Sequence, residues 1–105
     1  MNPVPLPISA ATAERRHDAG ALLVDIRPQV ARHQGSIGDA LLVDPTSLTD
    51  RFKVPSVDYD REIVVCSVSS HRAIPAAERL SRLGYRHVYY LAGGYAAWQN
   101  RHTAR

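Results

Sequence analysis

The chain has 105 residues, the size of one domain with a single hydrophobic core. Its 45% hydrophobic and 22% charged residues exclude a disordered chain, and no apolar run approaches the ~20 residues of a membrane-spanning helix. The net charge of +3 comes from basic residues spread along the chain, whereas nucleic-acid-binding proteins more often have a dense basic run. We therefore expect neither nucleic acid nor a membrane as a partner, and the positive charge favours a small anionic substrate.

The single cysteine, Cys66, excludes an intramolecular disulfide and a cysteine-based zinc cluster. A lone thiol persists in a reducing compartment, so we expect the protein to be cytoplasmic. Residues 1–7 contain three prolines and no basic region, which is not typical of a secretory signal. The histidines are scattered along the sequence, so we expect no metal site and no other cofactor.

The first half of the chain predicts two short strands separated by loops. Residues 1–7 are expected to be an extended N-terminal extension. Ser9 is placed to cap a helix over residues 10–18, which Gly20 ends. The apolar run at residues 21–24, closed by Asp25, predicts a buried strand, and residues 26–38 predict a loop with at most one helical turn. Residues 41–43 predict a second strand, residues 47–52 a short helix or turn, and residues 54–60 a loop.

The second half of the chain carries the stronger signals. Residues 62–66 predict a strand, residues 73–83 a helix that Gly84 ends, and residues 87–91 the last strand. Residues 93–94 predict a turn, and residues 95–101 a closing helix with Trp98 on its inner side. Strands that are apolar throughout and alternate with helices are typical of a parallel sheet covered on both faces. The fold class is therefore α/β, with three layers.

The segment Cys-Ser-Val-Ser-Ser-His-Arg (residues 66–72) lies between the strongest strand and the following helix, where parallel α/β folds bind ligands. Backbone N–H groups of such a loop can surround an anion, and the helix N-terminus adds positive potential, which lowers the pKa of a nearby cysteine. Arg72 adds a planar guanidinium suited to a tetrahedral oxyanion. We therefore predict Cys66 as the catalytic nucleophile. The predicted substrate-binding residues are Ser67, Val68, Ser69, Ser70, His71 and Arg72.

Structural interpretations stand beside these functional ones. A free cysteine often only fills a core, although the serine-rich loop and Arg72 favour a functional role for Cys66. His71 could donate a proton to a leaving group, but an exposed loop residue is the simpler interpretation. The loop serines could bind an anion or cap the helix. We expect Asp25 and Arg27 to support the neighbouring loop through an ion pair or backbone hydrogen bonds.

Several segments together resemble the rhodanese-like family of single-domain sulfurtransferases. They are Ala-Leu-Leu-Val-Asp-Ile-Arg (residues 21–27), Gly-Ser-Ile-Gly-Asp-Ala (residues 35–40), Ala76-Ala77, Leu80, Gly84-Tyr85, residues 88–94 and Trp98. The resemblance covers about residues 8–100, and we expect the domain to span residues 8–102. It implies a central five-stranded parallel sheet flanked by helices and a persulfide intermediate on Cys66. It also implies a small anionic sulfur donor such as thiosulfate, and cyanide or a thiol, including a protein thiol, as acceptor.

The active-site segment departs from this family. The Ala-Ala pair usually lies nine residues after the cysteine, but Ala76 lies ten after Cys66, which predicts a loop one residue longer. The Cys-x5-Arg spacing resembles the dual-specificity phosphatases and arsenate reductases of the same fold. Alternatively, Pro75 shifts the start of the helix and absorbs the extra residue. Ser69 also replaces a loop glycine.

Three functions therefore stay open at this point. The leading hypothesis is sulfur transfer through Cys66. The second is a phosphatase or arsenate reductase. The third is a non-catalytic module that binds a ligand or senses sulfur or redox state.

Overall fold

The computed structural model describes residues 4–53 and 58–103, so the predicted extension and the predicted loop at residues 54–60 lie partly outside it. The strands are β1 (Leu6–Ile8), β2 (Leu22–Asp25), β3 (Leu41–Leu42), β4 (Glu62–Cys66) and β5 (His87–Leu91). The helices are α1 (Ala10–Asp18), α2 (Leu48–Phe52), α3 (Ser70–Arg82) and α4 (Gly94–Thr103). Two 3₁₀ turns, η1 (Gln29–Gln34) and η2 (Pro45–Ser47), complete the described elements.

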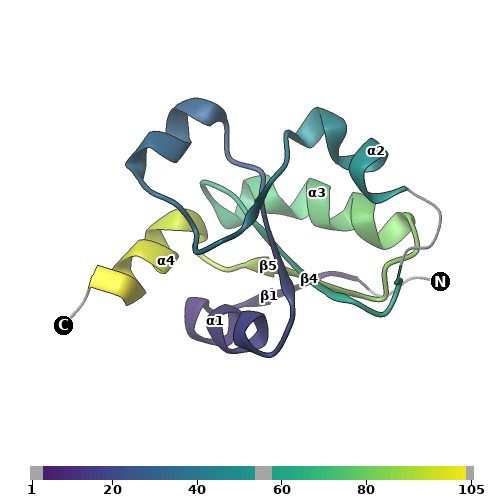
Figure 1. Ribbon diagram of the computed structural model, residues 1–105, viewed down its shortest axis with the longest axis horizontal. Coiled ribbons are helices and arrows are strands. Elements are labelled where there is room, and N and C mark those ends of the chain that lie inside the picture. Colours follow the sequence, from purple (N-terminus) through teal and green to yellow (C-terminus); the bar gives the residue numbers. More distant parts are fainter. Residues whose placement is uncertain (1–3, 54–57, 104–105) are drawn as a thin grey trace.

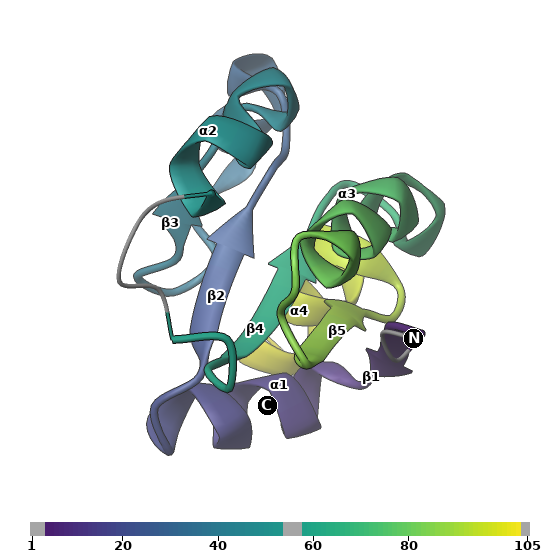
Figure 2. The ribbon, with the colours of Figure 1, turned by 90° about the vertical axis from the view of Figure 1, so that its right-hand side faces the viewer.

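The strands form one parallel sheet in the order β1-β5-β4-β2-β3 (Figure 1). Helices α2 and α3 cover one face of the sheet, and α1 and α4 cover the other (Figure 2). The predicted five-stranded three-layer α/β fold is confirmed. The order places β4 at the centre of the sheet, with its last residue, Cys66, in register with Asp25 of β2.

Side chains alternate between the two faces along each strand, which divides the interior into two clusters. In β4, Ile63 and Val65 point into the cluster beneath α2 and α3. Val64 and Cys66 point into the other cluster, beneath α1 and α4. We call these two sides the α3 face and the α4 face. Because β4 ends at Cys66, the alternation directs the next residue toward the α3 face.

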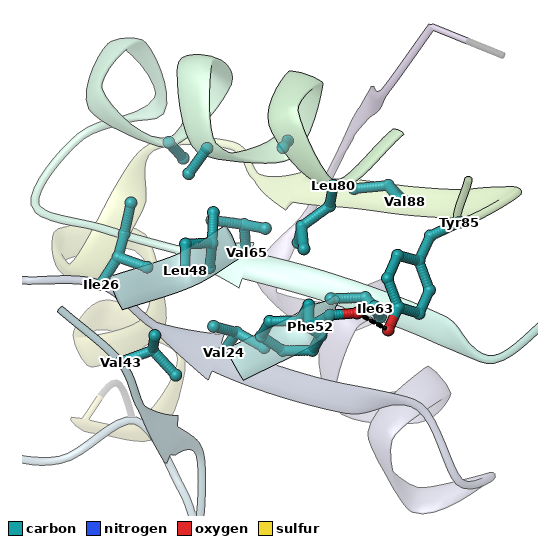
Figure 3. Close-up of a cluster of buried hydrophobic side chains, with 13 residues drawn as sticks. Val24, Ile26, Val43, Leu48, Phe52, Ile63, Val65, Leu80, Tyr85 and Val88 are labelled. Carbon is teal, nitrogen blue, oxygen red and sulfur yellow. Dashed lines mark hydrogen bonds between the residues drawn. The ribbon is translucent and has the colours of Figure 1, made fainter. Parts of the chain in front are cut away.

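The cluster on the α3 face is closed at one end by aromatic residues (Figure 3). The rings of Phe52 and Tyr85 meet edge to face with their centroids 5.7 Å apart. The Tyr85 hydroxyl donates a hydrogen bond of 2.8 Å to the carbonyl oxygen of Phe52. This bond satisfies the polar end of a buried tyrosine and attaches α2 to the segment that follows α3. Val65 lies in the same cluster, one residue before Cys66.

Most predicted boundaries lie within one or two residues of the observed ones, and two differences are larger. Leu6 and Pro7, which the sequence analysis placed in an N-terminal extension, form an edge strand with β5, and residues 1–3 lie outside the described residues. The helix predicted over residues 73–83 begins three residues earlier, at Ser70. The cause is Ser69, whose side chain accepts a hydrogen bond from the backbone N–H of Arg72 and caps the helix there.

Candidate functional site

An open pocket of about 720 Å³ lies on the α3 face, at the carboxyl edge of the sheet. Helix α3 contributes His71, Arg72, Pro75, Ala76 and Arg79 to its lining. The loops that follow β2 and β3 contribute Ile26, Pro28, Asp44 and Pro45, and Ser67 lines it at the end of β4. A pocket of this size and place is typical of ligand sites in parallel α/β proteins.

Cys66 does not line this pocket. Its side chain is 0% exposed and packs on the α4 face with apolar residues that include Leu23, Leu91 and Trp98. Its Sγ lies 3.8 Å from the carbonyl oxygen of Val64, to which the thiol donates a weak hydrogen bond. The predicted nucleophile is therefore next to the pocket along the chain, but its sulfur points to the opposite face of the sheet.

The predicted lowering of the Cys66 pKa is wrong for this conformation. Burial, together with the negative charge of Asp25, raises the pKa of Cys66 to about 12, although the positive charge of Arg27 opposes this effect. The prediction failed because it assumed that the thiol faces the helix N-terminus. An apolar environment instead disfavours the charged thiolate.

A buried ion pair fills the α4 face beside Cys66. Asp25 and Arg27 are both buried, and the Nη2 of Arg27 lies 2.8 Å from the Oδ2 of Asp25. The Arg27 guanidinium also donates to the carbonyl oxygen of Gly35 at 2.7 Å and lies 4.3 Å from the centre of the Tyr95 ring. The expected ion pair is thus present, and it connects β2 to the loop after η1 and to α4. These contacts leave the α4 face closed at the carboxyl edge.

The loop between β4 and α3 consists only of Ser67, Val68 and Ser69. Cys66 is the last residue of β4, so the segment from Cys66 to Arg72 is made up of the end of the strand, this loop and the first turn of α3, and the lengthening relative to the family stays a prediction. Pro75 does not shift the helix start, since α3 runs through it. Counted from Ser67 instead of Cys66, Ala76 lies nine residues further along, the usual family spacing.

The turn between β5 and α4 holds this loop in place. The N–H of Tyr95 donates to the carbonyl oxygen of Ser67 at 2.9 Å, and the N–H of Gly93 donates to the Ser70 hydroxyl at 2.7 Å. Gly94 has φ of 61° and packs directly against the loop. A Cβ at Gly94 would lie 2.6 Å from the carbonyl carbon of Val68, so only glycine fits. The sequence predicts the turn at residues 93–94 but not its contact with the β4–α3 loop.

The predicted substrate-binding residues take different places. Ser67, His71 and Arg72 line the pocket. Val68 is 45% exposed and does not line it. The hydroxyls of Ser69 and Ser70 are used within the structure, one as the helix cap and the other as the acceptor from Gly93.

The charged groups of the pocket favour an anion near α3. The side chains of His71 and Arg72 are exposed there, and neither makes an ion pair with another of the described residues. Arg79 lies further along the helix and donates to the carbonyl oxygen of Pro45 at 3.2 Å. Asp44 brings a negative charge to the pocket lining. Its carboxylate accepts hydrogen bonds from the N–H and hydroxyl of Thr46, which lower its pKa and favour the charged form.

The far wall of the pocket consists of residues that the sequence did not single out. Pro28, Asp44 and Pro45 line it from the loops after β2 and β3, and Arg79 lines it from the second half of α3. Position in the fold is the signal that could have found them. Pro28, Asp44 and Pro45 follow strands that end at the same edge of the sheet as β4, and Arg79 lies on the same side of α3 as Arg72. Within residues 4–53 and 58–103, no group of three or more His, Cys, Asp or Glu side chains is placed to hold a metal ion. The described helices are too short or too polar to cross a membrane.

Comparison with known proteins agrees with this architecture. The family described as "Rhodanese-like domain" matches residues 9–101. The chain is 34% identical to a protein of Stutzerimonas stutzeri named thiosulfate sulfurtransferase GlpE, over 87% of this chain and 80% of that one. It is 30% identical to the GlpE of Pseudomonas fluorescens, over 88% of this chain and 83% of that one.

A solved structure shows the same relationship. The rhodanese-like domain of the Alr3790 protein from Anabaena sp. is 27% identical, with a TM-score of 0.70 over 89% of this chain and 93% of that one. The match to the family extends from the N-cap of α1 into α4 and includes the whole pocket. The chain therefore belongs to the rhodanese-like domain family.

Proposed function

We propose that the chain is a sulfurtransferase that takes sulfur from a small anionic donor such as thiosulfate and passes it to a thiol or to cyanide. The relatives named thiosulfate sulfurtransferase, which match most of the chain, carry this proposal. The anion pocket beside His71 and Arg72 supports it, because it offers positive charge at the end of the central strand. Cys66 is the only cysteine of the chain, so a persulfide can form only there.

The reaction on Cys66 has two steps. The thiolate attacks the outer sulfur of thiosulfate, a new S–S bond forms, and sulfite leaves with the electron pair of the broken bond. An acceptor thiolate or cyanide then attacks the outer sulfur of the persulfide and releases the Cys66 thiolate. Arg72 and the first-turn N–H groups of α3 orient the donor and stabilise the leaving sulfite.

The buried position of Cys66 sets a condition on this mechanism. Because its pKa is raised to about 12, the buried Cys66 is a neutral thiol near neutral pH. The sulfur also points away from the pocket, toward the α4 face. Sulfur transfer through Cys66 therefore requires its side chain to leave the apolar cluster and face the pocket. We expect this rearrangement to limit the rate.

Intact-protein mass spectrometry after incubation with thiosulfate tests the proposal. We expect one added sulfur atom, about 32 Da, that is absent in Cys66→Ala and removed by cyanide. A wild-type protein that gains no sulfur, or a Cys66→Ala variant that gains as much, would contradict sulfur transfer through Cys66.

A second candidate function is a non-catalytic binding module, and the closed surroundings of Cys66 favour it. The module would bind an anion in the pocket without transferring an atom. The rate of alkylation of Cys66 separates the two candidates. A sulfurtransferase thiol is alkylated directly, and prior incubation with thiosulfate lowers this direct alkylation because Cys66 then carries an outer sulfur atom, whereas an inert core thiol is alkylated slowly with or without thiosulfate.

A further inference from the structure

The side chain of Ser67 lies where the loop meets the pocket. Val65 packs on the α3 face and Cys66 on the α4 face, and the alternation returns to the α3 face at the next residue. The pocket is on that face, because Ile26 and Ala76 belong both to its lining and to the cluster beneath α3. Ser67 is thus the residue at the end of β4 that faces the pocket.

The hydroxyl of Ser67 lacks a partner within the protein. Ser67 is 2% exposed, and its carbonyl oxygen accepts a hydrogen bond from Tyr95, but its hydroxyl makes none with any of residues 4–53 or 58–103. Among the described residues, Arg16 Nε is the fully buried side-chain polar atom that lacks a partner, so the Ser67 hydroxyl reaches the pocket, where a ligand can pair with it. The neighbouring Ser69 and Ser70 differ, since both of their hydroxyls are hydrogen-bonded within the protein.

We propose that the Ser67 hydroxyl, together with the Arg72 guanidinium, binds a tetrahedral oxyanion in this pocket. The hydroxyl donates one hydrogen bond at the base of the pocket, and the guanidinium contributes charge and two further donors at its edge. Between them in the sequence, Ser70 and His71 begin α3, and their N–H groups belong to its first turn, whereas the N–H of Arg72 donates to the Ser69 hydroxyl. The inference rests on the proposed function only for the choice of thiosulfate as the anion, and the site stands even if Cys66 never carries sulfur.

Ser67 binds the anion in this proposal and does not react with it. Among the described residues no histidine or carboxylate is hydrogen-bonded to its hydroxyl, so no base is in place to activate it. A thiol at the same place needs no such base, because thiols ionise near neutral pH and the helix N-terminus favours the anion. The position that faces the pocket is therefore the one from which a cysteine would attack the donor.

Anion binding provides the first test. Thiosulfate, sulfate and phosphate are titrated separately into the wild-type protein and followed by amide NMR shifts, with sodium chloride at matched ionic strength as the reference. We expect all three oxyanions to shift amides of the β4–α3 loop. Ser67→Ala should weaken thiosulfate binding about five- to tenfold, and Arg72→Ala about tenfold or more.

The matched control is Ser47→Ala, which removes an exposed hydroxyl that neither lines the pocket nor caps a helix. It should leave the affinity unchanged. Equal affinities in the wild type and in Ser67→Ala would overturn the inference, and so would shifts that chloride reproduces.

Moving the thiol provides the second test. In the double variant Cys66→Ala with Ser67→Cys, we expect the new thiol to gain sulfur from thiosulfate at least tenfold faster than the wild type near neutral pH. Circular dichroism and the urea midpoint show whether the double variant is folded. If it is unfolded, the anion-binding test alone decides the inference. A folded double variant that gains sulfur no faster than Cys66→Ala alone would overturn the inference.

The inference and the proposed function fail in different ways. Binding that depends on Ser67, with no sulfur added to the wild type, contradicts sulfur transfer through Cys66 and supports the anion site. A persulfide on Cys66, together with an anion affinity that Ser67→Ala leaves unchanged, supports sulfur transfer through Cys66 and contradicts the anion site.

Discussion

The two faces of the sheet differ sharply at the carboxyl edge, although both are built from the ends of β2 and β4. On the α4 face, Cys66 and the Asp25–Arg27 pair are buried among side chains that leave no opening. On the α3 face, the same strands end at an open pocket with Ser67 at its base. A step of one residue along β4 therefore separates a thiol in an apolar cluster from a hydroxyl that faces solvent and ligand. Residue type alone therefore does not identify the reacting position.

The largest expected effect comes from breaking the ion pair on the closed face. Arg27→Ala leaves Asp25 buried without its partner, so we expect the free energy of unfolding to fall by about 3–5 kcal/mol. The control is Arg86→Ala, whose pair with Asp60 is exposed and should contribute less than about 1 kcal/mol. Urea denaturation measures both. Equal losses in the two variants would show that the α4 face is not closed in solution.

The next effect comes from the glycine that holds the loop between the two faces. Gly94→Ala places a methyl group 2.7 Å from the Cα of Ser69, so we expect a loss of about 2–4 kcal/mol and a displaced β4–α3 loop. Gly20→Ala is the matched control, because that glycine also has positive φ but has nothing within 4 Å of the added methyl group. It should lose only about 1 kcal/mol from backbone strain. If Gly94→Ala unfolds no more easily than Gly20→Ala, the loop does not pack against α4 as described.

The pH dependence of stability tests the state of the buried thiol. The folded pKa of Cys66, about 12, is above that of an unfolded cysteine, so the stability from the protonated thiol is complete below about pH 8.5 and is lost as pH rises toward 12. The free energy of unfolding of the wild type, relative to Cys66→Ala, should therefore fall by about 2 kcal/mol between about pH 8 and pH 10. Other titrating groups cancel in this difference. A difference that grows with pH would mean that the folded protein favours the thiolate and that Cys66 faces the pocket.

The sequence predicted the fold well because its signals are local. Apolar runs such as residues 62–66 and the Ser9 cap specify their elements directly, and the order of strands and helices then requires parallel connections. Edge strand β1 was not predicted, because its three residues, Leu-Pro-Ile, include a proline and form a strand only by pairing with β5.

The candidate site was predicted only in part, since its geometry depends on where β4 ends. The pattern located Arg72 and His71 at the pocket, but whether Cys66 or Ser67 faces it depends on strand alternation. The far wall depends on the way the loops after β2 and β3 fold over the sheet edge. The sequence around Pro28 or Asp44 contains no local pattern that predicts how these loops lie against the sheet edge.

The smallest expected effect, that of Ser67→Ala on stability, is also the one that most directly separates the two faces. A hydrogen-bonded buried hydroxyl typically contributes about 1 kcal/mol, but the Ser67 hydroxyl has no partner among the described residues. Its removal should leave the free energy of unfolding unchanged or raise it by up to about 1 kcal/mol, measured in urea without added anions. Adding sulfate should then stabilise the wild type more than Ser67→Ala, because ligand binding to the folded state raises its stability. If Ser67→Ala instead loses more than about 1 kcal/mol in the absence of anions, the hydroxyl already has a partner in the protein. The Ser67 hydroxyl on the α3 face would then be hydrogen-bonded within the protein, as the Asp25–Arg27 pair on the α4 face is.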